Sequence, residues 1–325
     1  MVYPADVRQD RPVEVFMAHM DVVFPDETEL PLRVEGGRIY CPGVGDNTAC
    51  LVCLLLAGKY IAGYVDSPRW REIRGENAPG LLLVCNAGEE GLGNLKGVHK
   101  ICEDYGDRME RFCTFDSSLS SIVDRAVGSK RFRVRVRTRG GHSYNNFGND
   151  NAIACLASLV GELYGIRVPE GGKTTYNVGM ISGGTSVNTI AQEAEMLYEF
   201  RSDRRENLEY MERQFMKVID RGKSEGMDVS LEIIGVRPCE GPVDPKRKQA
   251  LSDWAHRVVE EMTGQAPKHC AGSTDCNIPL SLGIPSVCVG SFRGAGAHTR
   301  EEYVETDSLE EGYKVAFGMI FGSRD

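Results

Sequence analysis

Short apolar runs alternate with helical stretches between residue 13 and about residue 120, and several of these runs end in an acidic or histidine side chain. Strands that are separated by helices favour a mostly parallel sheet with helices on both faces. Side chains that follow such strands meet at one edge of the sheet. The chain is therefore predicted to have an α/β fold with a polar site at the carboxyl ends of its strands.

Two adjacent glutamates follow one of these apolar runs. The run Leu81–Cys85 is followed closely by Glu89 and Glu90. Placing two carboxylates beside a buried strand is costly unless a positive charge lies next to them. Two neighbouring glutamates can have different roles: one can bind a metal, and the other can take a proton from water. A solvated acidic turn is the simpler alternative.

Other ligand-type side chains occupy comparable positions. His19 and Asp21 follow an apolar run and face the same side of an extended segment, where the carboxylate can fix the tautomer of the histidine. Asp46 lies between glycines before a predicted helix, and its carboxylate can bridge two cations about 3.5–4 Å apart. Asp116 ends another run, and His298 lies in a glycine-rich loop. A hydrogen-bonded polar pair and a helix N-cap are the simpler alternatives for the first two sites.

The hydrophobic pattern changes near residue 128. Residues 131–139 alternate strictly and place five arginines on one face, which is typical of a half-exposed antiparallel strand. The elements predicted after it are a helix at 151–164, strands at 176–181 and 195–201, a helix at 207–221 and a strand at 228–234. This β-α-β-β-α-β order is typical of a ferredoxin-like sandwich.

Beyond residue 237 the first pattern returns, with a predicted helix at 246–263 and a short strand at 286–290. We therefore predict a catalytic domain formed by residues 1–127 and 238–325. Residues 128–237 are predicted to form an inserted α+β domain, called the lid domain below. The arginine face of this domain is interpreted as a solvated or interface surface rather than a nucleic-acid site.

Charge and cysteine content narrow the choice of partner and compartment. A net charge of -9 and an isoelectric point near 5.4 argue against nucleic acid or an acidic membrane as a partner. No apolar stretch is predicted to reach the roughly 18–20 residues of a membrane span. Eleven cysteines without a regular framework predict free thiols and a cytoplasmic protein. The pair Cys50 and Cys53 lies in a predicted helix without a second pair, so no structural zinc site is predicted there.

Together these motifs resemble those of the M20 family of metallopeptidases and deacylases, which includes peptidase T, glutamate carboxypeptidases and acetylornithine deacetylase. The resemblance extends over nearly the whole chain. It implies that one divalent cation is bound by His19, Asp46 and Asp116, and a second by Asp46, Glu90 and His298. Carboxylate and imidazole ligands suit Zn²⁺, while Mn²⁺ and Co²⁺ stay open as alternatives.

The resemblance also implies roles for residues that bind no metal. Glu89 is the expected general base, and Asp21 is counted among the catalytic residues. In the lid, the Gly141-His142-Ser143 signature and the later Asn151-Ala152 match the family, and His142 is expected to stabilise the oxyanion. The residues expected to bind substrate are Asn188, Arg201 and, in the stretch Ser273–Asn277, Ser273 and Thr274.

The resemblance implies a small peptide or N-acyl amino acid as substrate and a homodimer formed through the lid. The stretch Thr114-Phe115-Asp116 favours the branch that resembles peptidase T, and hence di- and tripeptides. N-acyl amino acid deacylation is the alternative within the enzyme class, and a non-catalytic metal-binding or scaffold protein is the alternative outside it. Family members usually carry several dozen residues before the HxD strand, whereas His19 comes early in this chain.

Overall fold

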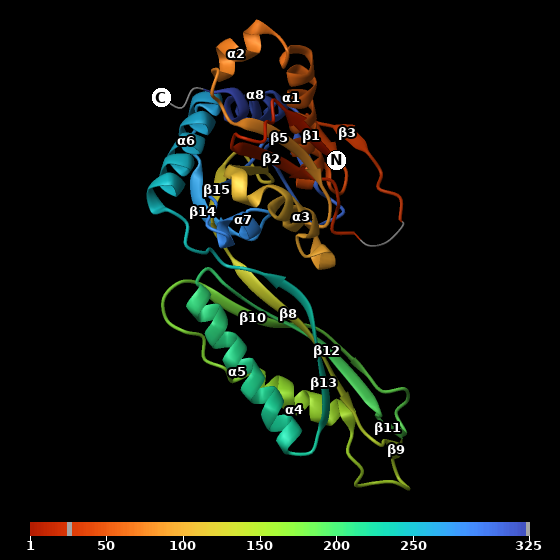
Figure 1. Cartoon of the computed structure of the whole chain (residues 1–325). Helices are drawn as coiled ribbons and strands as arrows, with labels where there is room; N and C mark the ends of the chain where they lie inside the picture. Colours follow the sequence, from red (N-terminus) through yellow and green to blue (C-terminus); the bar gives the residue numbers. More distant parts are fainter. Residues whose placement is uncertain (25–27, 323–325) are drawn as a thin grey trace. The chain divides into compact units, whose positions relative to one another are not determined.

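The computed structural model describes residues 1–24 and 28–322 (Figure 1). It divides into two compact units, of which unit 1 comprises Met1–Ala126 and Glu240–Asp325, and unit 2 comprises Val127–Cys239. The predicted domain boundaries lie within two residues of this division. Each unit has its own sheet and its own hydrophobic core.

Unit 1 is built on a mixed, mostly parallel sheet. Its strands, in spatial order, are β1 (Val2–Ala5), β5 (Gly80–Asn86), β2 (Val13–His19), β6 (Met109–Phe115), β15 (Ser286–Val289), β7 (Ser121–Ala126) and β14 (Lys268–Gly272). The two antiparallel pairs are β1 with β5 and β15 with β7, and the other four pairs are parallel. This arrangement agrees with the α/β prediction.

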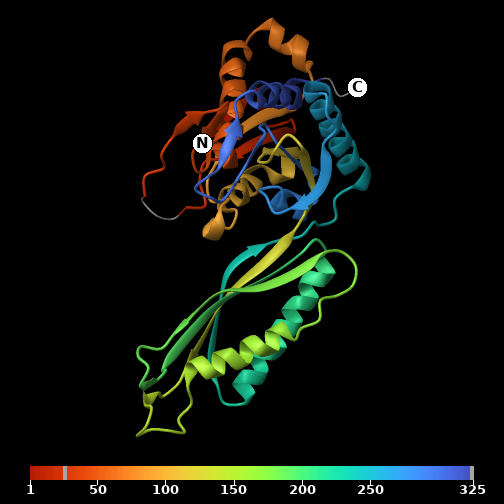
Figure 2. The same cartoon turned by 180° about the vertical axis from the view of Figure 1, so that it is seen from behind.

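Helices cover both faces of this sheet (Figures 1 and 2). The first face packs against α1 (Cys50–Tyr64), α2 (Pro68–Arg74), α6 (Pro245–Thr263) and α8 (Ser308–Phe321). The second face packs against α3 (Lys96–Tyr105) and α7 (Asn277–Ser281). Every residue of β2 and β5 is buried. Two-sided burial explains why these strands read as continuous apolar runs and not as alternating ones.

A second, smaller sheet in unit 1 was not predicted. Its strands, in spatial order, are β16 (Gly294–Ala295), β17 (Tyr303–Glu305), β4 (Arg38–Tyr40) and β3 (Arg33–Glu35). These strands are two or three residues long, which is too short to give a periodic signal. The sheet joins a segment near the N-terminus to the glycine-rich loop near the C-terminus.

One prediction about apolar segments is wrong. The helical segment Val44–Tyr64 is long and apolar enough to cross a membrane by length and composition alone. In unit 1, however, Cys50, Leu54, Ala57 and Ile61 on this segment are buried in the core against the sheet. Core helices of folded domains meet the same criterion, so packing is a sufficient explanation of its hydrophobicity.

Unit 2 has a four-stranded antiparallel sheet with both helices on one face (Figure 2). The strands, in spatial order, are β10 (Thr174–Gly183), β12 (Glu193–Ser202), β8 (Gly128–Arg137) and β13 (Asp228–Arg237). The helices are α4 (Ala152–Tyr164) and α5 (Arg205–Ser224), and a two-stranded ribbon pairs β9 (Gly141–His142) with β11 (Thr189–Ile190). Apart from this ribbon, the chain order is the predicted β-α-β-β-α-β.

The positive charges of the arginines on β8 are neutralised by glutamates on the neighbouring strands β12 and β13. Phe132, Val134 and Val136 are buried under the helices, as the alternation predicts. The arginines on the other face form cross-strand ion pairs, namely Arg131–Glu199 (3.3 Å), Arg133–Glu232 (2.8 Å), Arg135–Glu195 (2.5 Å) and Arg137–Glu193 (3.2 Å). Opposite charges on adjacent strands support the sheet register.

Candidate metal centre

Ligand-type side chains gather at the carboxyl edge of the unit 1 sheet. Three neighbouring strands supply most of them, because β2, β5 and β6 are parallel and end at the same edge. His19 is the last residue of β2, Glu89 and Glu90 follow β5, Asp116 follows β6, Asp46 lies in the irregular turn before α1, and His298 lies between β16 and β17. All six side chains named by the sequence come together within unit 1.

Asp46 lies between two histidines. Its Oδ1 is 3.1 Å from Nε2 of His19, and its Oδ2 is 3.1 Å from Nε2 of His298. His19 Nε2 is also 3.5 Å from Oδ1 of Asp116, and His298 Nε2 is 3.3 Å from Oε1 of Glu90. Two three-residue donor sets result, and they share the Asp46 carboxylate. This is the arrangement that a carboxylate bridging two cations requires.

The unsatisfied atoms of these side chains fit bound cations. His19 Nε2 and Asp46 Oδ1 are both buried and have no hydrogen-bond partner among the described residues. Buried polar atoms are rarely left unpaired, so a missing electrophile explains both. The donors are imidazole nitrogens and carboxylate oxygens, which suit Zn²⁺, Mn²⁺ or Co²⁺.

The pKa values of the ligand-type side chains indicate which proton a cation would replace in the metal-free site. Burial alone would lower the pKa of His19, but the nearby carboxylates of Asp116 and Asp46 raise that pKa to about 12. Burial alone would raise the pKa of Asp46, but His19 and His298 hold it below its usual value. Burial and the nearby Asp46 carboxylate raise the pKa of Glu90. A cation therefore has to displace a proton from His19 on binding.

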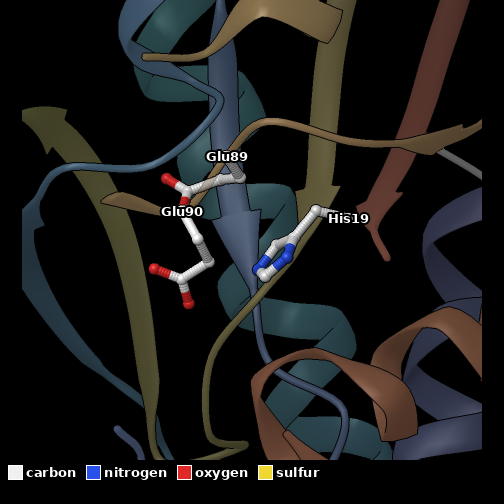
Figure 3. Close-up of side chains that lie close together, drawn as sticks. All are labelled: His19, Glu89 and Glu90. Carbon is white, nitrogen blue, oxygen red and sulfur yellow. The ribbon is translucent and has the colours of Figure 1, made fainter. Parts of the chain in front are cut away.

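Glu89 lies beside the donor sets and is only 5% exposed. Its carboxylate forms a third group of close oxygen and nitrogen atoms with His19 and Glu90, and Figure 3 shows the three side chains together. It belongs to neither of the two sets that share Asp46. Glu89 is thus near the cation sites without being needed to complete either set.

Asp21 lies beside His19, as the sequence predicts, with its Oδ1 3.7 Å from Nδ1 of His19, and it also orders the turn after β5. Its carboxylate accepts hydrogen bonds from the backbone N–H groups of Gly88 and Glu90, both at 2.9 Å. The nearest approach to the His19 ring comes instead from the backbone carbonyl oxygen of Asp21, 3.0 Å from Nδ1. The carboxylate therefore holds the turn that carries the two glutamates, and the carbonyl fixes the histidine tautomer.

Most side chains in the stretch Ser273–Asn277, which follows β14, are buried. Thr274 is 7% exposed, and its hydroxyl accepts a hydrogen bond from the backbone N–H of Cys276. Ser273 is partly exposed. Asp275 is fully buried and accepts a hydrogen bond from Asn86 at the end of β5 (2.8 Å). The burial of Thr274 is at odds with its predicted contact with substrate, and Asp275 with Asn86 supports the edge of the sheet.

His142 and Asn188 are neighbours in unit 2. The backbone N–H of Ser143 donates to the carbonyl of Asn188 (3.0 Å), beside the short β9–β11 ribbon. Nδ1 of His142 is 3.2 Å from the backbone nitrogen of Tyr144, which donates to it. Since Nδ1 accepts, the neutral ring carries its proton on Nε2, and the exposed side chain can donate a hydrogen bond from there. Asn188 is also exposed, and its Oδ1 accepts a hydrogen bond from Ser186.

Arg201, on β12, already has a carboxylate partner. Its Nε and one terminal nitrogen donate to the two oxygens of Glu199, at 2.9 and 3.1 Å. Burial would raise the pKa of Glu199, but Arg201 and Arg131 hold it below its usual value. The side chain of Arg201 is 37% exposed. Glu199 orients the guanidinium while leaving part of it accessible.

One carboxylate at this edge was missed by the sequence reasoning. Glu302 is 2% exposed and accepts three backbone hydrogen bonds from the loop that carries Asp46. The available signal was a second adjacent pair, Glu301 and Glu302, shortly after His298. Its partners are backbone groups, which no residue pattern reveals.

Comparison with known proteins gives the family. The profile of Peptidase family M20/M25/M40 matches residues 15–321. A succinyl-diaminopimelate desuccinylase of Nitrosococcus oceani is 25% identical over 65% of this chain, and the aligned part spans 58% of that relative. The corresponding enzyme of Bordetella parapertussis is 24% identical over 92% of this chain and 79% of the relative.

The fold has close counterparts among solved structures. The crystal structure of the aminopeptidase PepT from Bacillus cereus superimposes with a TM-score of 0.70 at 19% identity, covering 99% of this chain and 83% of that one. This likeness confirms the α/β fold class. The profile match over most of the chain confirms the resemblance that its motifs suggested. The chain belongs to peptidase family M20/M25/M40, a family of metal-dependent hydrolases.

Proposed function

We propose that this chain is a two-metal amide-bond hydrolase that acts on di- and tripeptides. The observation that carries the proposal is the pair of donor sets that share Asp46, with Glu89 beside them. His19, Asp46 and Asp116 would hold one cation, and Asp46, Glu90 and His298 the other. Bound cations of this kind polarise the scissile carbonyl and lower the pKa of water from 15.7 toward ~7.

Protein side chains would then transfer the protons and stabilise the negative charge that develops on the carbonyl oxygen. Glu89 is positioned to take a proton from the attacking water and to return it to the leaving amine. Asp21 keeps Glu89 in place through the backbone of the turn. His142 has the tautomer that lets Nε2 donate to an oxyanion.

A cavity beside the donor sets leaves room for a small substrate. It has a volume of about 290 Å³, and Asp46, Asp116, Ser117 and Phe292 are among its lining residues. The remaining lining residues are Ser118, Gly294, Ala295, Gly296, Ala297 and Glu302, so none of its lining residues is basic. Asp46 and Asp116 belong to the donor sets and Glu302 is held by backbone N–H groups, so the part of the lining that stays free for a substrate carries no charge.

The substrate class is tested with matched amides. The protein, loaded with Zn²⁺, Mn²⁺ or Co²⁺, is assayed on tripeptides, dipeptides, their N-acetylated forms, and N-acetyl and N-succinyl amino acids. We expect the highest kcat/KM for di- and tripeptides. Faster cleavage of N-succinyl amino acids would assign the chain to the deacylases instead.

Deacylation is the second candidate, because the two curated relatives described above are desuccinylases. A non-catalytic metal-binding or scaffold role is the third. It would be supported if none of these amides were cleaved by the fully metal-loaded protein. The presence of Glu89 next to both donor sets argues against it, since a scaffold has no use for a base there.

Arg201 is proposed to bind the carboxylate terminus of the substrate, together with Asn188. Arg201→Ala should lower kcat/KM about 10–100-fold for tripeptides with a free carboxylate, because a charged hydrogen bond contributes about 1.5–3 kcal/mol. The corresponding peptide amides should be affected much less. The matched control is Arg137→Ala, which removes an exposed arginine paired with Glu193 on the same sheet. Equal losses on acids and amides would make Arg201 structural.

We propose further that two copies associate through unit 2. Strand β10 lies at the edge of its sheet, and Met180 and Ile181 on it are 64% and 58% exposed. An exposed edge strand with apolar side chains is a ready surface for pairing with another chain. In a two-fold dimer the same edge would be used by both copies.

The register of unit 2 supports sharing of sites in such a dimer. Along β12, Arg201 lies opposite Ser129 of β8, and Glu193 lies opposite Arg137. Arg201 and Glu193 are therefore eight residues apart on one strand, or about 27 Å. His142 lies beyond the Glu193 end, opposite Thr189. An extended tripeptide spans at most ~11 Å. One tripeptide is too short to contact Arg201 and His142 of the same copy, so the proposal that both residues bind substrate requires a partner to supply one of them.

The proposed compartment is the cytoplasm. All eleven cysteines are free thiols in the structure, and most are buried. Burial raises the pKa of Cys102 to about 12, which keeps this thiol protonated and unreactive. A reducing compartment suits a chain with this many unpaired thiols.

A further inference from the structure

Glu302 is a buried carboxylate with an unusual set of partners. It lies four residues after His298, immediately before β17, and is 2% exposed. The ion pairs found among the described residues do not include it. A buried carboxylate is costly unless hydrogen bonds compensate for the loss of water. Its partners therefore indicate what holds it there.

All three side-chain partners of Glu302 belong to the loop before α1. Oε2 accepts a hydrogen bond from the backbone N–H of Gly43 at 2.6 Å. Oε1 accepts from the backbone N–H groups of Gly45 at 2.9 Å and of Asp46 at 2.7 Å. The backbone carbonyl of Glu302 also accepts from the N–H of Cys41 at 3.1 Å. Successive backbone N–H groups that converge on one anion form a strong and directional nest.

The loop is shaped to fit this carboxylate closely. Gly43 has φ +78°, a left-handed conformation that favours glycine. A Cβ on Gly45 would lie 2.7 Å from the Phe292 ring and 3.0 Å from Oε1 of Glu302. No regular helix fixes the direction of Asp46, since its φ and ψ of −103° and 84° are not helical. The contact with Glu302 is thus what orients the peptide unit from which the Asp46 carboxylate projects.

We propose that Glu302 is a positioning residue that ties the His298 loop to the Asp46 loop and thereby sets the affinity of the site for its cations. The inference rests on the proposed metal centre. Asp46 contacts both His19 and His298, so a small rotation of its carboxylate would disturb both donor sets. Groups that orient metal ligands in this way typically change metal affinity 10–100-fold when they are altered.

The test is Glu302→Gln, which keeps the size of the side chain but replaces one acceptor oxygen by an NH₂ group. That group faces backbone N–H donors, so at least one hydrogen bond is lost whichever way the amide is turned. We expect the dissociation constant for Zn²⁺, measured by competition with a chromophoric chelator, to rise about 10–100-fold. Activity lost at low Zn²⁺ should return as the concentration of Zn²⁺ is raised.

The matched control is Glu301→Gln. It removes the same charge from the adjacent residue, whose side chain is 81% exposed and pairs loosely with Arg33 at 3.8 Å. Its affinity for Zn²⁺ should equal that of the unaltered protein. A purely structural role of Glu302 would lower the melting temperature of the metal-free protein and leave the Zn²⁺ dissociation constant unchanged, which would overturn the proposal.

Folding defects are separated from loss of affinity in two ways. Glu302→Asp keeps the charge but is one methylene too short to reach all three N–H groups, and it should also bind Zn²⁺ more weakly. If Glu302→Gln folds poorly, rising Zn²⁺ should restore its melting temperature, and absence of such rescue would contradict the proposal. Failure of the unaltered protein to bind Zn²⁺ would refute the proposed function, which is a different outcome.

Discussion

Replacing Glu89 by Gln is expected to lower kcat about 10²–10⁴-fold while the bound metal is retained. The substitution preserves the shape of the side chain and removes its ability to take a proton. Glu89 is almost fully buried beside the donor sets but completes neither of those that share Asp46. The measurement is kcat on the best tripeptide, combined with elemental analysis of the same desalted sample.

Two further variants make the assignment of Glu89 specific. Glu90→Gln should lose metal, because Oε1 of Glu90 lies 3.3 Å from Nε2 of His298 in a donor set. Glu103→Gln is a suitable control, since its side chain is 69% exposed on α3. Loss of metal in Glu89→Gln together with its retention in Glu90→Gln would show that the two roles are reversed.

Replacing His142 by Ala is expected to lower kcat about 10²–10³-fold, the usual cost of losing one donor to an oxyanion. The affinity for cations should not change, because His142 lies in unit 2 and the donor sets lie in unit 1. The exposed Tyr144→Ala variant is a control for the same loop. An unchanged kcat in His142→Ala would remove this residue from the mechanism.

Mixing two inactive variants tests whether His142 acts across a dimer. In a mixed dimer of Glu89→Gln and His142→Ala chains, the His142→Ala chain keeps its own Glu89 and borrows His142 from its partner. The other site lacks both groups. Random exchange at equal amounts places half of the dimers in mixed form with one intact site of two, so about a quarter of the activity should return. No recovery after confirmed exchange would place His142 in its own chain's site or outside catalysis.

The parts of the fold that sequence predicted are those with a local hydrophobic signal. The alternation at residues 131–139 identifies β8 because its apolar side chains face the helices and its arginines face solvent. The apolar run that ends at His19 identifies β2 because both faces of that strand are covered. The short strands β3, β4, β16 and β17 have two or three residues each and leave no such signal.

The candidate site shows the same division. Of its six ligand-type residues, His19, Glu89, Glu90 and Asp116 could be named because they follow predicted strands, and the resemblance to the family added Asp46 and His298. The hydrogen bonds that orient them could not be named, because their partners are backbone groups far away in the chain. Glu302 reaches Gly43 across 259 residues, and Asp21 reaches Gly88 across 67. Both contacts depend on the completed fold.

One chain is expected to hold two divalent cations at the edge of the unit 1 sheet. The most direct measurement is the metal content, by elemental analysis, of folded protein that has been loaded with Zn²⁺ and then desalted. We predict close to two ions per chain for the unaltered protein, and close to none for Asp46→Ala, since Asp46 is shared by both donor sets. A value near zero in properly folded, unaltered protein would contradict the account.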